Sequence, residues 1–129
     1  VWGIAPDFYI HSGLPPATRF ALPQDSISGY VPGRQAEGPV TAASQAASAR
    51  DWDLLLGDLE RHHATFILDM APTGLRRWNA FPVARFPQLR AYLAAHYDAL
   101  ATVDRALIYR RRGCAGRPLD DAPYVRGPG

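Results

Sequence analysis

Four side chains between positions 69 and 78 have the types and spacing that could bind a ligand. The first, Asp69, ends a short apolar segment and precedes an irregular stretch. In open α/β sheets ligands bind beyond the carboxyl ends of the strands, where a carboxylate can bind a sugar hydroxyl or a metal, or act as a base. The alternative is an aspartate that caps backbone amides of the loop that follows it.

The loop after Asp69 is unusually basic and aromatic, with Arg76, Arg77 and Trp78 in succession. An indole can stack on a sugar ring, and guanidinium groups hold phosphate through paired hydrogen bonds. The alternative is a loop packed as a cover over the edge of the sheet. We predict Asp69, Arg76, Arg77 and Trp78 as ligand-binding residues, and we expect no catalytic residue in the chain.

Metal and cofactor chemistry is disfavoured by the remaining polar residues. The adjacent His62 and His63 point about 100° apart on a helix, and each could recruit only one acidic partner a turn earlier. Cys114 is the only cysteine, which excludes an internal disulfide and a multi-cysteine metal site. The sequence contains no G-x-S-x-G, G-x-G-x-x-G or P-loop motif. We expect no metal and no cofactor.

The composition is that of one globular domain of 129 residues with a formal net charge of +2. All the positively charged side chains other than histidine are arginine. This favours either a phosphate- or nucleic-acid-binding surface or the codon bias of a GC-rich genome. The arginines are scattered except for the run 110–112, which is typical of a solvated strand end and could also contact anionic lipid. We therefore expect no nucleic-acid partner.

The chain is organised around segment 48–70, which predicts an amphipathic helix followed by a short strand. Trp52, Leu55, Leu56 and Leu59 form one apolar stripe at helical spacing. The strand formers at 65–68 are apolar on successive residues, which is typical of a strand buried on both faces in a parallel or mixed sheet.

The other predicted elements follow in chain order. They are a strand at 1–4, a helix at 6–12, a strand at 18–22, a surface loop at 23–38, an alanine-rich helical segment at 39–49 that either joins the central helix or stands alone, a helix at 87–100 and a hairpin at 101–109. The predicted fold is a single three-layer α/β domain over residues 1–112, with a mixed sheet of about four to five strands flanked by helices. An irregular tail is expected at 113–129.

Four segments occur in an order and spacing that resemble one protein family. They are VWG with PDFYIHSGLPPATRF, DWDLLLGDLERHHATFILD, FPQLRAYLAAHY and ALIYRRR. Together they resemble the C-terminal extracytoplasmic domain of GT-C class membrane glycosyltransferases, the protein-mannosyltransferase-like and aminoarabinose-transferase-like proteins that use a polyprenyl-phosphate sugar donor. The matching features are Trp2-Gly3, Tyr9, Thr18-Arg19-Phe20 and Tyr109-Arg110-Arg111.

This resemblance implies an accessory module of a membrane-embedded glycosyltransferase, which positions the acceptor or covers the active site. No catalytic residue carries over, because the family's catalytic acid lies in an early loop outside this segment. The expected partners are the transmembrane portion of the same polypeptide and a lipid-linked sugar or glycan acceptor, on the periplasmic side of the inner membrane. The chain begins abruptly in a strand-like segment, so we expect a fragment of a longer protein. The alternatives are a free-standing module for a carbohydrate or phosphorylated ligand, and a purely structural interaction domain.

Overall fold

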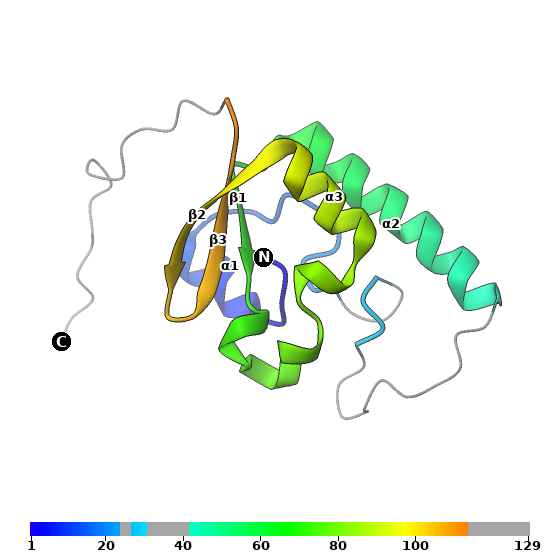
Figure 1. The fold of residues 1–129 in the computed structure, drawn as a ribbon, viewed down its shortest axis with the longest axis horizontal. Helices are drawn as coiled ribbons and strands as arrows, with labels where there is room; N and C mark the ends of the chain where they lie inside the picture. The colour runs from blue at the N-terminus through cyan, green and yellow to red at the C-terminus, as the bar shows by residue number, and fades with distance from the viewer. Residues whose placement is uncertain (24–26, 31–41, 114–129) are drawn as a thin grey trace.

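The computed structural model describes residues 1–23, 27–30 and 42–113 (Figure 1). In chain order its elements are α1 (Pro6–Ser12), α2 (Ala42–His62), β1 (Phe66–Asp69), the 3-10 helices η1 (Ala71–Thr73), η2 (Leu75–Ala80) and η3 (Val83–Arg85), α3 (Pro87–His96), β2 (Tyr97–Val103) and β3 (Ala106–Arg111). The predicted combination of helices and strands is confirmed. The predicted loop at 23–38 and tail at 113–129 lie largely outside the described residues.

The first two helices follow the sequence signals closely. Helix α1 begins at Pro6, whose fixed φ suits a first helical position, and ends before Gly13, which adopts a left-handed φ of 67°. Helix α2 joins the alanine-rich and amphipathic segments into one helix of 21 residues. Its buried side chains Trp52, Leu55 and Leu59 lie on the predicted apolar stripe. Among the described residues, none of the helices combines the length and hydropathy of a membrane-spanning segment.

The sheet has three antiparallel strands in the order β1-β3-β2. The predicted hairpin is confirmed, since β2 and β3 are joined at Asp104 and Arg105, both at positive φ. In the other pair, Ile67 of β1 lies opposite Tyr109 of β3. The prediction of four to five strands is wrong for the described part of the chain, because two N-terminal segments do not form strands there.

The first of these segments, residues 1–4, makes only a single bridge beside β1. The Trp2 N–H donates to the Leu68 carbonyl (2.7 Å), and the Met70 N–H donates to the Trp2 carbonyl (3.0 Å). This bridge runs parallel to β1, unlike the pairings within the sheet. The predicted combination of parallel and antiparallel pairing is therefore limited to the single bridge at Trp2.

The second segment, residues 18–22, is a series of bends and lies against α2. Arg19 donates its backbone N–H (3.0 Å) and its Nε (2.9 Å) to the same oxygen of Asp58, and its second guanidinium nitrogen to the other oxygen (2.9 Å). This attachment to the helix competes with strand pairing. The strand propensity of the segment is overridden by one ion pair that the local sequence does not reveal.

Helix α3 ends at His96, earlier than the predicted end at position 100. The guanidinium of Arg112 donates to the carbonyls of Ala94 (3.2 Å) and Ala95 (3.1 Å), and so satisfies the last turn of the helix. The chain then enters β2 directly. Tyr97 is buried as the first residue of that strand, which is why the apolar spacing continues past the end of the helix.

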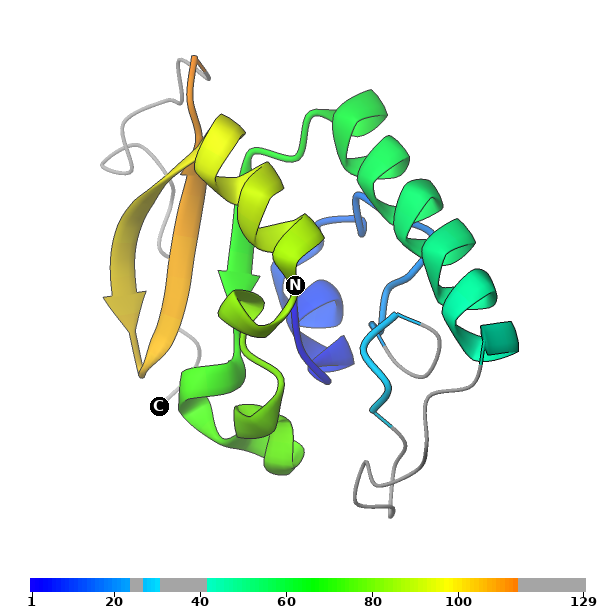
Figure 2. The ribbon, with the colours of Figure 1, turned by 45° about the vertical axis from the view of Figure 1, so that its right-hand side comes forward.

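Helix α3 lies between the sheet and α2 in both views (Figure 1 and Figure 2). Burial alternates along β1, with Ile67 and Asp69 buried and Phe66 40% exposed. The predicted burial of this strand on both faces is therefore wrong, because its outer side chain remains accessible. The residues of its inner face share the core with α3.

The core is centred on the three tryptophans, which are each at most 4% exposed. The Trp2 ring centroid lies 5.8 Å from that of Trp52 and 5.6 Å from that of Trp78. The Trp2 Nε1–H also donates to the Phe81 carbonyl (2.8 Å). These contacts hold the loop after β1 against the N-terminal segment and against α2, and so fix the position of the predicted site.

Candidate functional site

Asp69 lies at the end of β1 with its side chain directed into its own loop. The carboxylate is 2% exposed and accepts hydrogen bonds from the backbone N–H groups of Ala71 (3.0 Å) and Val83 (3.1 Å). Burial raises the pKa of Asp69, and the two hydrogen bonds oppose that shift. The geometry is that of an aspartate capping loop amides, with both ends of the loop attached to one carboxylate.

Trp78 lies in the core and has no exposed surface. Its indole stacks on Phe81 with a centroid distance of 5.1 Å and meets Tyr30 edge-on at 5.3 Å. Its Nε1 is buried, with no hydrogen-bond partner among the described residues. In this conformation neither face of the ring is open to a sugar, so the alternative of a packed loop accounts for Trp78.

Arg76 and Arg77 are exposed, and both have left-handed backbone conformations, with φ of 53° and 61°. Such values cost about 1–2 kcal/mol for each residue with a side chain. The surrounding structure therefore has to hold them in place. We call residues 74–77 the arginine turn.

Hydrogen bonds on both sides fix the arginine turn. The Leu75 N–H donates to Thr73 Oγ1 (3.1 Å), and the Arg77 N–H donates to the Gly74 carbonyl (3.1 Å). From a distant part of the chain, the Tyr30 hydroxyl donates to the Arg76 carbonyl (2.9 Å). The next residue along the chain is the buried Trp78. Two exposed cations are thus carried on a turn with a rigid base.

The stretch of chain around the arginine turn carries only positive formal charge. Residues 70–97 contain no aspartate or glutamate, whereas they contain four arginines at positions 76, 77, 85 and 90. Within the described residues, neither Arg76 nor Arg77 forms an ion pair. Unpaired guanidinium groups retain their full capacity to bind an anion. Of the four predicted residues, the structure therefore leaves these two free to meet a ligand and places Asp69 and Trp78 inside.

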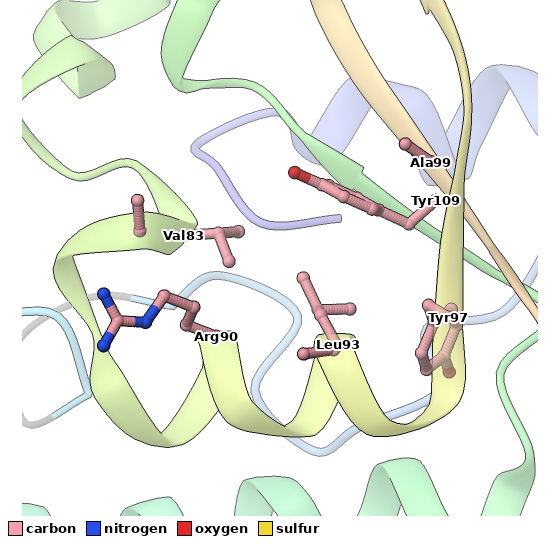
Figure 3. Close-up of a pocket in the computed structure, with 8 residues that line it drawn as sticks. Val83, Arg90, Leu93, Tyr97, Ala99 and Tyr109 are labelled. Atoms are coloured by element: carbon pink, nitrogen blue, oxygen red, sulfur yellow. The ribbon is translucent and has the colours of Figure 1, made fainter.

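A small pocket lies between α3 and the inner face of the sheet (Figure 3). Its volume is about 240 Å³, below the range of about 300–1,000 Å³ typical of drug-sized ligands. Figure 3 shows the Tyr109 hydroxyl over Leu93, while the Arg90 guanidinium extends away from it. Burial, and secondarily the charge of Asp69, raises the pKa of Tyr109, so this hydroxyl stays protonated at neutral pH. Because its polar groups do not converge, we do not assign a site here.

The acidic residues near the histidine pair are engaged in ion pairs. Asp58 is 3% exposed and is bound by Arg19, and Arg61 approaches the same carboxylate at 3.4 Å. Glu60 accepts from Arg111 (3.0 Å) and from the Tyr92 hydroxyl (2.9 Å). Within the part of the chain that the structure describes, no group of three or more histidine, cysteine or acidic side chains could hold a metal ion.

These ion pairs are positions that sequence inspection missed. Arg19 and Asp58, like Glu60 and Arg111, lie far apart in the chain, and no short motif links them. Sequence inspection named Arg19 only as a feature of the family resemblance, and Arg111 as a feature of it and within the run 110–112, and gave no signal for their acidic partners. The role of the two ion pairs is to attach the bends at 18–22 and the end of β3 to α2.

The Arg19–Asp58 pair predicts an acid-sensitive fold. Hydrogen bonds from the Arg19 side chain and backbone hold the pKa of Asp58 well below its usual range. A carboxyl whose folded pKa is lowered stabilises the fold above its unfolded pKa of about 3.9, and this stabilisation is lost as the pH falls further. We expect Asp58→Asn to be less stable at neutral pH and to show a weaker fall in urea midpoint between about pH 6 and pH 2. If the urea midpoints of the two proteins fell equally with pH, Asp58 would not be the source of the acid sensitivity.

Comparison of the chain with protein-family models, with curated proteins and with solved structures gives no match.

Proposed function

We propose that this domain is a non-catalytic extracytoplasmic module of a membrane glycosyltransferase that uses a polyprenyl-phosphate sugar donor. The observation that carries the proposal is the arginine turn, which presents two exposed guanidinium groups on a rigid base, neither of them in an ion pair with another described residue. We assign to it the binding of a phosphate group, and through it the positioning of substrate or the covering of the active site. The remainder of the same polypeptide, in the membrane, is the expected partner.

Three of the residues that carry the family resemblance support an accessory role, because they hold the fold together. Gly3 passes so close to Met70 that a Cβ at position 3 would lie 2.6 Å from the Met70 Cβ. Arg19 binds Asp58, and Arg111 binds Glu60. Groups used in this way are not available for acid–base or nucleophilic chemistry. They act as a structural signature, and recognition is left to other residues.

The chemistry of the arginine turn suits a phosphate more than a neutral sugar. Guanidinium groups form paired, charge-assisted hydrogen bonds with phosphate oxygens. Residues 70–97 contain no acidic side chain that could compete with a ligand for the two cations from the same stretch of the chain. Because the turn is already fixed by Tyr30 and Thr73, less conformational entropy is lost on binding.

Titration of the purified chain with geranyl phosphate, a short soluble prenyl phosphate, tests this proposal. Calorimetry should detect saturable binding, weaker binding of inorganic phosphate and none of geraniol. The double variant Arg76→Gln, Arg77→Gln should bind at least about tenfold more weakly, because each charged hydrogen bond contributes about 1.5–3 kcal/mol. The matched control is Arg50→Gln with Arg105→Gln, which removes the same charge from exposed positions elsewhere.

Three outcomes would contradict the proposal. The first is no binding of geranyl phosphate, and the second is binding that the arginine-turn variant leaves unchanged. The third is transfer of sugar from a polyprenyl-phosphate donor by the purified chain alone. Tight binding of a hexose phosphate, with no preference for the prenyl chain, would favour the alternative of a free-standing module for phosphorylated ligands.

A further inference from the structure

We infer that the arginine turn is also a membrane-docking element, which lies on an anionic lipid surface with Leu75 inserted between the headgroups. This inference extends the proposed function, since it names the surface against which the same turn works. It depends on three features of the described residues: an exposed apolar side chain, the cations beside it and a rigid support.

The apolar feature is Leu75, which is 47% exposed and directly precedes Arg76 and Arg77. An exposed leucine next to two consecutive arginines suits the interface of a bilayer. The apolar side chain enters the acyl boundary, and the cations stay at the lipid phosphates. Other exposed apolar side chains, such as Leu14 and Val103, have no such pair of arginines adjacent in sequence.

A further arginine, Arg85, belongs to the same loop and is held by residues next to Trp78. The Arg85 guanidinium lies 4.9 Å from the centroid of the Phe81 ring and donates to the Ala80 carbonyl (2.7 Å). Phe81 in turn stacks on Trp78, which directly follows the arginine turn. Arg85 is therefore held in the same local structure. Each arginine near an anionic membrane strengthens binding by about fivefold.

Hydrogen bonds fix the loop that carries Leu75, which distinguishes this surface from a flexible basic loop. Figure 2 shows η1 and η2 at the lower end of the described body, away from α2, with η3 between them and the start of α3. The Leu75 N–H is bound by Thr73, and Asp69 attaches both ends of the loop. Leu75 is therefore presented without a folding step on binding, which would otherwise reduce affinity.

Co-sedimentation with lipid vesicles tests the inference without any prenyl phosphate present. The chain should bind vesicles of phosphatidylcholine mixed with phosphatidylglycerol, and should not bind vesicles of phosphatidylcholine alone. Arg76→Gln with Arg77→Gln should weaken binding about 25-fold, following the fivefold effect of each arginine. Leu75→Ala should weaken it by roughly tenfold, as expected for partial burial of the lost methylene groups.

Two controls make the test specific. Arg50→Gln with Arg105→Gln removes the same charge, and Leu14→Ala removes an exposed leucine elsewhere; both should bind the mixed vesicles like the unaltered chain. Failure to bind the mixed vesicles, or equal losses in the controls, would overturn the docking surface. Vesicle binding has no bearing on geranyl phosphate, so a chain that binds the soluble prenyl phosphate and ignores these vesicles would retain the proposed function and lose this inference.

Discussion

Replacing Trp78 by alanine should lower the free energy of unfolding by about 3–5 kcal/mol, the range for truncation of large buried aromatic side chains. Trp78 has no exposed surface and contacts the rings of Trp2, Phe81 and Tyr30. Its removal leaves a cavity at the point where the N-terminal segment meets the loop. Urea denaturation followed by circular dichroism measures the change as a fall in midpoint.

Two matched variants separate packing from ligand contact at Trp78. Trp78→Phe keeps a ring and removes the unpartnered Nε1–H, so we expect a smaller loss than with alanine. Ile10→Ala alters a side chain that is 75% exposed and should change stability by less than about 0.5 kcal/mol. If Trp78→Ala left the urea midpoint unchanged and abolished binding of a sugar, the indole would belong to a ligand site and not to the core.

The variant Asp69→Ala should lower the free energy of unfolding by about 2–4 kcal/mol. It leaves the buried N–H groups of Ala71 and Val83 without an acceptor, and each buried unsatisfied group costs about 1–3 kcal/mol. The loss is partly offset because burial raises the pKa of Asp69, which means that the ionised carboxylate is itself disfavoured in the fold. The same urea experiment measures it.

The pH dependence gives Asp69 an independent test. Since its folded pKa is raised, its ionisation destabilises the fold as the pH increases, which is the opposite sign to Asp58. Asp69→Asn keeps one acceptor oxygen and places an NH₂ group against the other N–H, so it should lose about half as much stability as alanine. Full stability of Asp69→Ala, together with weaker ligand binding, would show that the carboxylate serves a ligand.

Elements set by local signals could be predicted from the sequence. Pro6 and Gly13 fix the ends of α1, and the spacing of Trp52, Leu55 and Leu59 fixes the face of α2. The β2–β3 hairpin follows from two apolar runs around a short polar turn. In each case the information lies within a few residues, where propensity and periodicity operate.

Elements set by distant partners could not be predicted in this way. The segment 18–22 has strand propensity, but Arg19 is bound to Asp58 from across the fold. Helix α3 stops at His96 because Arg112, after the hairpin, satisfies its last carbonyls. A tertiary contact overrides the local preference in both cases, and only the arrangement in space reveals it.

The candidate site also has one part set by local sequence and another set by distant contacts. Sequence reasoning found the basic loop, because Arg76 and Arg77 are adjacent. It could not tell which of the four predicted residues face solvent, since the loop has no periodicity to mark an inner and an outer side. Burial of Trp78 follows from its contact with Trp2, at the other end of the described fold in sequence. The left-handed φ of the two arginines also has no signal in their residue type.

Under the proposed function, recognition resides in the arginine turn, while the buried polar groups maintain the fold. Mapping of amide chemical shifts of the ¹⁵N-labelled chain during titration with geranyl phosphate tests this most directly. We expect the largest shifts to fall within residues 73–79 and to disappear in the Arg76→Gln, Arg77→Gln variant. Shifts centred on Leu93, Ala99 and Tyr109 in the pocket between α3 and the sheet, with none at the arginine turn, would contradict it.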